Sequence, residues 1–402
     1  MNQIKNQYRS LYDCIIVGGG MVGAALSLAL CKQNKTVLLV EKQLPTKTWL
    51  ENPPLRVSAV NRFSEDYLRS LNLWPHINEK SKCAFTQLAT WEKPEQPLLF
   101  DAKDINAEHL GYLIRNEALQ IAAYEEFQHI NNPPDILSGY QVQSLLSDTS
   151  GDKQVDLCLE SDQKTITVSA NLVIGADGAF SQIRQLSGIG ITGWDYQQHC
   201  LSITLKTDFP TQDITWQEFQ PSGPKAFLPL SDGYSCLIWY DSPELIKQLT
   251  NLKPDELKQK ILSVFPKLAG DFDVIKQAAF PLTRRQANQY FKHRIVLVGD
   301  AAHTINPLAG QGVNLGYKDV AELVQQLESV ELTDDQQLDK ALTHYQRVRK
   351  AESLLMSGAM DSFYALFSND KPPLKAARTM MLNMASRFEW AKKQVLKKAI
   401  GY

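Results

Sequence analysis

A glycine pattern between an apolar strand and a helix most constrains how this 402-residue chain folds. Residues 13–17 are typical of a buried strand, Gly18, Gly20 and Gly23 follow at GxGxxG spacing, and Glu41 ends the next apolar strand. The first glycine permits a tight turn, the second lets the backbone approach a pyrophosphate, and the third allows close helix–strand packing. Glu41 would accept hydrogen bonds from a ribose diol. The pattern predicts dinucleotide binding by a parallel α/β unit, without distinguishing NAD from FAD, and a purely structural glycine turn is the alternative.

Composition and charge exclude several classes of protein. The run from Cys14 to Cys31 is uncharged, but its glycines and β-branched start favour strand, turn and helix over a membrane span or signal peptide. Lys+Arg 42 against Asp+Glu 44 gives a net charge of -2, which argues against nucleic-acid binding. The six cysteines show no CxxC or zinc spacing. We therefore expect reduced, mostly buried thiols in a cytoplasmic protein without a metal site.

Two later segments each join a strand to a polar turn. Gly175, Asp177 and Gly178 follow one apolar strand, and an Asp-Gly pair in that place is usually only a turn. Asp300 and His303 follow another apolar strand and precede Pro307 and a glycine-rich segment, which consists of Gly310, Gln311, Gly312, Val313 and Asn314. For the segment that begins at Asp300, the alternative is a simple turn capped by Asp300. However, this segment contains more Gly, Pro and Asn residues than such a turn needs.

In this order and spacing, the three segments resemble the flavoprotein aromatic hydroxylases, the class A monooxygenases. The resemblance implies that the first segment holds the ADP half of FAD, that the second serves FAD and the reducing nicotinamide, and that Asp300 holds the ribityl chain. Arg56 matches a family arginine near the flavin. Arg115 stands where an acid is usual, so either Arg115 contacts the cofactor or Glu117 takes over the role of the acid. The cofactor-binding residues expected from the resemblance are Gly18, Gly20, Gly23, Glu41, Arg56, Arg115, Asp177, Gly178, Asp300, Pro307, Gly310, Gln311, Gly312, Val313 and Asn314.

The chemistry that the resemblance implies belongs mainly to the cofactor. NAD(P)H reduces FAD, O2 adds to give a C4a-hydroperoxide, and an electron-rich ring attacks its distal oxygen. We assign no certain catalytic side chain; Pro307 and His303 are candidates near the flavin, and we favour a structural role for His303. A helix beginning after Gly312 would stabilise negative charge on the reduced flavin. Four aromatic residues either line an apolar quinol pocket or pack in the core: Trp216, Phe219, Phe227 and Trp239.

Longer runs narrow the resemblance to the ubiquinone-biosynthesis hydroxylases. Residues 301–316, 223–230 and 280–285 carry it, and residues 357–374 resemble in particular the member that installs the last ring hydroxyl. The implied function is FAD-dependent hydroxylation of a polyprenyl benzoquinol, with other proteins of quinone biosynthesis as candidate partners. Two alternatives stay open: a sibling hydroxylase acting at another ring position, and a flavin-binding scaffold without turnover.

The resemblance and the strand patterns together predict the domain organisation. We expect a discontinuous Rossmann-like FAD-binding domain over 1–75, 105–190 and 276–345 and a mostly antiparallel β substrate domain over 76–104 and 191–275. C-terminal helices are expected over 346–402. Residues 374–402 carry seven basic residues and one acid, with apolar residues at helical spacing. Such a helix suits an anionic lipid surface at the inner face of a membrane, a partner protein, or the chain's own catalytic domain.

Overall fold

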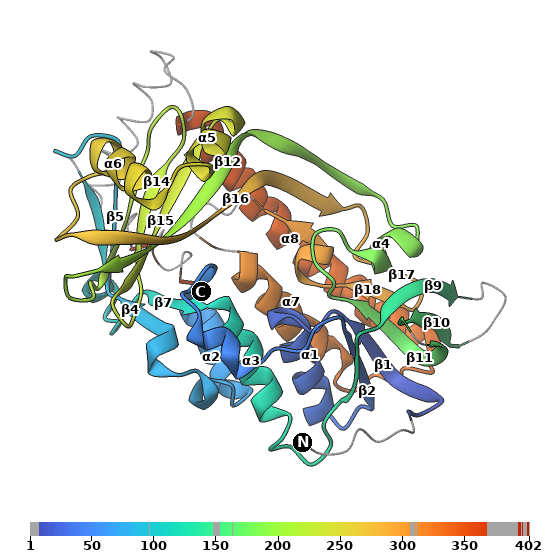
Figure 1. Cartoon of the computed structure of the whole chain (residues 1–402). Coiled ribbons are helices and arrows are strands. Elements are labelled where there is room, and N and C mark those ends of the chain that lie inside the picture. Colours follow the sequence, from blue (N-terminus) through green and yellow to red (C-terminus); the bar gives the residue numbers. More distant parts are fainter. Residues whose placement is uncertain are drawn as a thin grey trace.

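The structure is a computed structural model. It describes residues 8–95, 97–147, 153–162, 164–305, 310 and 312–367, together with 393, 394, 396, 400 and 401. Figure 1 shows a first sheet that is flanked by helices and, beside it, a second sheet. One long helix reaches both sheets.

The first sheet has the strand order β17-β18-β11-β1-β2-β8, and β9 and β10 extend it from β11. Neighbouring strands from β18 to β8 run parallel, whereas β17 and the β9–β10 hairpin pair antiparallel. These strands are β1 (Leu11–Val17), β2 (Val37–Glu41), β8 (Asp135–Ser138), β9 (Gln141–Ser147), β10 (Val155–Glu160), β11 (Thr165–Gly175), β17 (Phe291–Lys292) and β18 (Ile295–Leu297).

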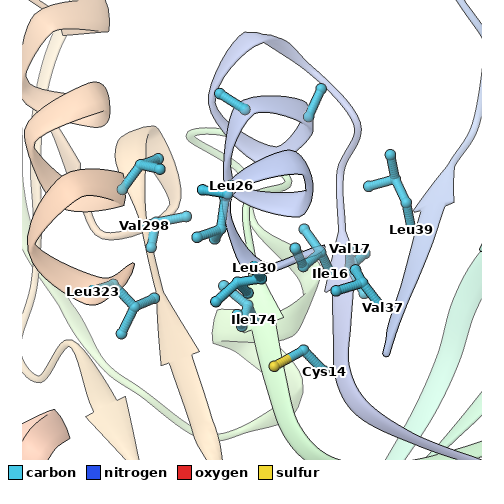
Figure 2. Close-up of a cluster of buried hydrophobic side chains, with 14 of the residues drawn as sticks. Cys14, Ile16, Val17, Leu26, Leu30, Val37, Leu39, Ile174, Val298 and Leu323 are labelled. Carbon is cyan, nitrogen blue, oxygen red and sulfur yellow. The ribbon is translucent and has the colours of Figure 1, made fainter. Parts of the chain in front are cut away.

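Helices cover the parallel strands because those strands are apolar on both faces. The helix α1 (Met21–Lys32) packs against α3 (Asn116–Glu126) and α7 (Gly312–Leu327). Figure 2 shows Leu26 and Leu30 of α1 beside Ile16 and Ile174 of the sheet, with Leu323 of α7 nearby. This is the main core of the molecule, and the uncharged run after Cys14 therefore forms a strand, a turn and a buried helix.

The second sheet has the order β19-β16-β12-β15-β14-β13-β5-β6, and only the β13–β5 pair is parallel. The helices α5 (Pro243–Thr250) and α6 (Pro254–Val264) pack on one of its faces (Figure 1). Its strands are β5 (Gln87–Trp91), β6 (Leu98–Asp101), β12 (Ile191–Thr207), β13 (Ile214–Glu218), β14 (Lys225–Pro229), β15 (Tyr234–Asp241), β16 (Phe272–Ala287) and β19 (His303–Thr304).

A small third sheet, β3-β7-β4, lies where the two larger sheets meet. It consists of β3 (Val57–Asn61), β7 (Gly111–Arg115) and β4 (Lys82–Phe85). The helix α2 (Arg62–Ser70) directly follows β3 in the chain. The long helix α8 (Asp335–Phe367) packs on α7 and reaches the second sheet (Figure 1). The short helices are α4 (Gln182–Leu186), η1 (Lys47–Glu51), η2 (Trp74–His76), η3 (Glu79–Ser81), η4 (Ala102–Ile105) and η5 (Gly299–Ala301).

The predicted fold class is confirmed: an α/β unit with a parallel sheet is joined to a second, mostly antiparallel sheet, with helices toward the C-terminal end. The exact domain division stays a prediction, and its boundary at 275/276 falls inside β16, which runs unbroken over Phe272–Ala287. Among the described residues, no helix combines the length and apolar character that crossing a bilayer requires. Five cysteines are buried, Cys158 is half-buried, and all six are free thiols.

Candidate functional site

Three chain segments meet at one edge of the first sheet. The strands β1, β11 and β18 are neighbours, and their last residues are in register, with Val17 opposite Gly175 and Gly175 opposite Leu297. Each of the three predicted polar segments follows one of these strands. In open α/β sheets, ligands bind outside the carboxyl ends of the parallel strands, so this edge is the candidate active site.

The three glycines of the first segment have different surroundings. Gly18 has φ +102°, and a Cβ there would lie 2.4 Å from the Ala176 carbonyl oxygen. A Cβ on Gly23 would lie 1.9 Å from the Gly18 carbonyl oxygen, so only glycine lets α1 pack so closely on the turn. At Gly20, by contrast, an added Cβ meets no protein atom within 4 Å. The open space is therefore in front of the helix N-terminus, where a pyrophosphate would lie.

Side chains from two elements fix the loop that carries these glycines. The Oε2 atom of Glu41 accepts a hydrogen bond from the Gly19 N–H at 2.5 Å, and Oε1 accepts from Gln43 N–H at 3.0 Å. From α3, Gln120 Nε2 and Tyr124 Oη donate to the Gly19 carbonyl at 2.9 and 3.2 Å. Glu41 thus lies beside the glycine loop, as a ribose-binding carboxylate must.

Asp177 of the second segment uses only one of its carboxylate oxygens. Its Oδ2 accepts from the backbone N–H groups of Gln182 and Ile183 at 2.6 and 3.1 Å, and so caps α4. Its Oδ1 is buried without a hydrogen-bond partner among the described residues. Gly178 has φ +80° and open space around it. A turn explains the first oxygen but leaves the second as an acceptor for a ligand.

Arg184 joins the second segment to the third. Its two terminal nitrogens donate to the carbonyl oxygens of Ala301 and Ala179 at 3.0 and 3.1 Å, and the side chain is buried. The guanidinium is therefore a bridge within the protein, which is a structural role.

Asp300 of the third segment is exposed in the turn that follows β18. Its side chain is accessible to water, although the surrounding protein is dense enough to raise the pKa of the carboxyl above its usual 3.8. Smaller contributions come from His303, which lowers the pKa, from Asp319, which raises it, and from Arg56, which lowers it. The charge of the exposed Arg56 thus acts on Asp300 in the direction that favours the carboxylate form.

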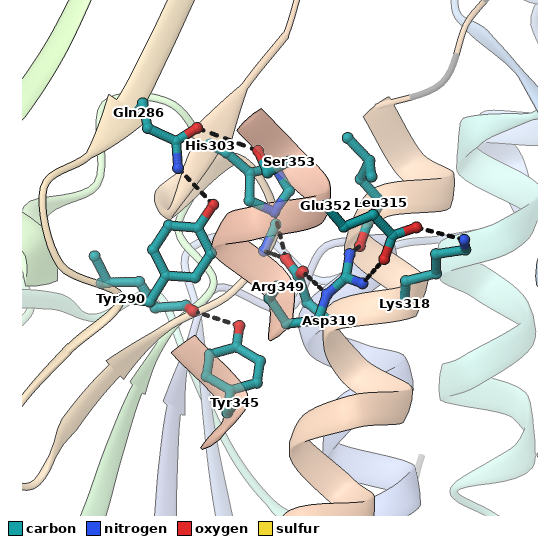
Figure 3. Close-up of polar contacts among 12 residues, drawn as sticks. Gln286, Tyr290, His303, Leu315, Lys318, Asp319, Tyr345, Arg349, Glu352 and Ser353 are labelled. Atoms are coloured by element: carbon teal, nitrogen blue, oxygen red, sulfur yellow. Dashed lines mark hydrogen bonds and ion pairs between the residues drawn. The ribbon is translucent and has the colours of Figure 1, made fainter. Parts of the chain in front are cut away.

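A buried ion network holds the turn that presents Asp300 (Figure 3). Asp319 is fully buried, and its Oδ2 lies 2.6 Å from His303 Nε2 and accepts from the Gly299 N–H at 2.8 Å. Its Oδ1 accepts from Arg349 Nε at 2.7 Å, and Arg349 also pairs with Glu352. Burial raises the pKa of Asp319, but the charges of His303 and Arg349 outweigh it and hold the pKa below 3.8. His303 is thus part of the scaffold.

The glycine-rich segment packs on β3. Gly310 has φ +63°, and a Cβ there would lie 3.3 Å from the Ala59 Cβ. The buried Asn314 donates from Nδ2 to the Ala59 carbonyl at 2.8 Å and accepts from the Asn61 N–H at 3.1 Å. Gly312, at the start of α7, has no atom within 4 Å of an added Cβ. The first turn of α7 is therefore tied to β3 while its N-terminus faces open space.

The remaining predicted residues have varied surroundings. Val313 is buried beside Asn314, and Pro307 and Gln311 lie outside the described residues. The terminal nitrogens of Arg115 donate to the carbonyl groups of residues 49, 50 and 52 at 2.8 to 3.1 Å. Arg115 thus holds the segment that leads to Arg56, and a direct contact with a cofactor stays a prediction.

The second sheet turns an apolar face toward β3. Because side chains alternate along a strand, Phe227 and Leu237 point to α5 and α6 and are fully buried, whereas Leu228 and Ile238 point the other way. Leu228 and Ile238 are only half-buried and cluster with Val57 of β3. Leu228 and Ile238 were not singled out from the sequence, because the strand register cannot be read from the sequence.

Two roles were left open for the four aromatic residues, pocket lining and core packing, and core packing holds for three of them. Trp216, Phe227 and Trp239 pack in the cluster beneath α5 and α6, on the face opposite β3, so core packing is their role. Phe219 stacks on Phe367 of α8, with ring centroids 4.3 Å apart.

Comparison with known proteins identifies the family. Residues 12–355 match the family model described as FAD binding domain. The chain belongs to the FAD binding domain family. It is 40% identical over 391 residues to 3-demethoxyubiquinol 3-hydroxylase of Escherichia coli, covering 97% of this chain and 98% of that one. It is 30% identical to the rat mitochondrial ubiquinone biosynthesis monooxygenase COQ6, covering 96% and 90%. The structure of p-nitrophenol 4-monooxygenase PnpA from Pseudomonas putida shares the fold, with a TM-score of 0.80 at 18% identity over 98% of this chain and 99% of that one.

The residues present fit the cofactor of this family. Open space lies at Gly20, Gly178 and Gly312, the Asp177 Oδ1 atom lacks a partner among the described residues, and Asp300 is accessible. Within the described part of the chain, no group of three His, Cys, Asp or Glu side chains is placed to hold a metal ion.

Proposed function

We propose that this chain is an FAD-dependent, NAD(P)H-using monooxygenase that hydroxylates the ring of a polyprenyl benzoquinol, demethoxyubiquinol, in ubiquinone biosynthesis. The observation that carries the proposal is the meeting of three flavin-type segments at the carboxyl ends of β1, β11 and β18, opposite an apolar sheet face. The near full-length similarity to a 3-demethoxyubiquinol 3-hydroxylase supports the choice of substrate.

The polar residues of the site would each hold one part of the cofactor. The N-terminus of α1 and Glu41 would bind the pyrophosphate and the ADP ribose, and Asp300 the ribityl hydroxyls. The N-terminus of α7 points its free N–H groups and positive dipole end at the open space near Gly312, which favours negative charge there. FAD bound there would supply the oxygen-transfer chemistry, with NAD(P)H as the reductant and O2 as the co-substrate.

The overall reaction balances without a protein nucleophile. A ring C–H bond is replaced by C–OH, one oxygen atom of O2 enters the ring, and the other leaves as water while NAD(P)H is oxidised. The quinol supplies its own electron density, so the chain's tasks are to orient the ring and exclude water. His303 is unsuited to proton transfer with substrate because it is 2% exposed and bonded to Asp319. The inner face with Leu228 and Ile238 supplies the apolar surface that such orientation needs.

We also propose a cytoplasmic enzyme that contacts the inner face of the membrane peripherally. The predicted helix over 374–402 lies largely outside the described residues, but Leu396 and Ile400 are buried in a cluster with Leu98 and Phe100. The Ile400 carbonyl accepts from the Phe63 N–H at 3.2 Å. Leu396 and Ile400 thus contact the chain's own domain, and we propose that the basic residues of 374–402 contact a membrane or a partner protein.

Purified protein tests the reaction directly. Protein loaded with FAD is supplied with NADH or NADPH, demethoxyubiquinol and isotopically labelled O2, and the product is weighed. We expect one labelled oxygen atom in the ring, and none with Asp300→Ala. A labelled hydroxyl at another ring position would indicate the sibling hydroxylase instead, and flavin binding without any product would favour the scaffold.

A further inference from the structure

The end of α8 packs against the inner face of the second sheet. Its residues Met360 and Tyr364 contact a cluster formed by Tyr196, Cys200, Tyr240 and Leu282. Both side chains are only half-buried. They belong to the segment whose sequence most resembles one particular member of the branch, and no role described so far uses them.

The side chains around Met360 continue to the cofactor side of the molecule. Ile238 and Phe280 pack in the same cluster as Met360, and Ile238 also packs in the cluster that contains Val57 and Leu113. Val57 begins β3, the strand on which the glycine-rich segment lies. We call the half-buried residues Val57, Ile238, Phe280, Met360 and Tyr364 the apolar strip.

The strip contrasts with the opposite face of the same strands. There Leu201, Leu237 and Trp239 are at most 3% exposed, because α5 and α6 cover them. Large apolar side chains left half-covered on a continuous interior face indicate a surface for an apolar ligand. The strip begins on the cofactor side, at Val57, so an apolar ligand on the strip would extend from a molecule bound beside the cofactor.

An ion pair fixes α8 against the sheet at this point. The Asp361 carboxylate accepts a hydrogen bond from Tyr196 Oη at 2.5 Å and pairs with the Arg284 guanidinium on β16. Arg284 lies over the Trp194 ring at 4.4 Å, and the Tyr196 and Tyr364 ring centroids are 4.9 Å apart. The wall formed by Met360 and Tyr364 is therefore held at a set distance from the sheet.

We propose that Met360 and Tyr364 form one wall of an isoprenoid-binding site that holds the first units of the substrate's polyprenyl tail. The proposal rests on the proposed function, which supplies a ligand with a polar ring and a long apolar tail. The two residues are one helical turn apart, about 6 Å along α8, which is comparable with one isoprene unit. A flexible thioether beside an aromatic ring suits a branched, flexible chain.

The test compares binding of two benzoquinones to the FAD-loaded enzyme. One carries two isoprene units and the other is the same ring without a tail, and binding is followed by the change in flavin absorbance, without turnover. Met360→Ala should weaken binding of the tailed compound about tenfold, the loss expected when most of one buried apolar side chain is removed. Binding of the tailless compound should stay unchanged, and Met360→Leu should restore the tailed affinity.

Leu355→Ala is the matched control, since Leu355 is on the same helix but 69% exposed. It should bind both compounds as the wild type does. Equal losses for both compounds with Met360→Ala, or wild-type enzyme that binds both alike, would overturn the proposal. Failure of the enzyme to hydroxylate any quinol would refute the proposed function, whereas the dependence of affinity on the tail would still decide the inference.

Discussion

Removing the charge of Asp319 should weaken both the fold and the binding of FAD. Asp319 receives three donors, the Gly299 N–H, His303 Nε2 and Arg349 Nε, at 2.6 to 2.8 Å and without solvent. Breaking a buried ion pair from one side costs about 3–5 kcal/mol. Asp319→Asn keeps one acceptor oxygen and the shape of the side chain, so we expect the lower end, about 3 kcal/mol.

The effect on FAD follows from the Gly299 hydrogen bond. That bond holds the first residue of the turn that presents Asp300, so loosening it should weaken FAD binding even where the protein stays folded. Urea unfolding of the cofactor-free protein gives the free energy of unfolding, and fluorescence titration gives the FAD affinity. Asp339→Asn, an exposed carboxylate on α8, is the control and should change neither.

The pH dependence of the difference in unfolding free energy between wild type and Asp319→Asn provides a second check. Asp319 has a lowered pKa in the folded state, so its carboxylate stabilises the fold fully above the unfolded-state pKa and loses this effect as the pH falls through the folded-state value. The free-energy difference between wild type and Asp319→Asn should shrink as the pH falls below about 4, where the Asp319 carboxylate loses its stabilising charge. Wild-type stability and FAD affinity in Asp319→Asn would refute the reasoning.

Three further outcomes follow from the structure. Gly23→Ala places a Cβ 1.9 Å from the Gly18 carbonyl oxygen, so the variant should lose FAD, as measured by the flavin absorbance of the purified protein. In native protein a thiol reagent should modify Cys158 first, because the other five thiols are buried and burial raises the pKa of Cys236 to about 11; rapid reaction of all six would contradict this. Leu396→Asp should lower the melting temperature by burying an unpaired carboxylate beside Leu98, and an unchanged temperature would show that this residue is not docked there.

Local steric requirements are what the sequence predicts well. The glycine turn after β1 depends on neighbours within one loop, so Gly18, Gly20 and Gly23 could be assigned distinct roles from their spacing. The structure shows a steric reason at Gly18 and Gly23 and open space at Gly20. Asp177 and Asp300 could likewise be recognised as following apolar strands, and the structure shows that these strands, β11 and β18, are neighbours.

Relations between distant residues were beyond the sequence. The pairing of Asp319 with Arg349 joins α7 and α8 through two residues that are 30 positions apart in the chain, and neither residue stands in a recognisable motif. Strand faces depend on register, so Trp216 and Trp239 were indistinguishable from pocket residues, and Ile238 was overlooked. The domain boundary at 275/276 stays a prediction, and it falls within β16 (Phe272–Ala287).

The central claim is tested most directly by the quinones of living cells. Escherichia coli lacking its own 3-demethoxyubiquinol 3-hydroxylase is grown in air with this chain, with Asp300→Ala or with neither, and its lipids are weighed by mass spectrometry. We predict that demethoxyubiquinone accumulates without the chain, that the wild-type chain restores ubiquinone, and that Asp300→Ala does not. Failure of the folded, FAD-loaded wild-type chain to restore ubiquinone, or full restoration by a variant shown to lack flavin, would contradict the account.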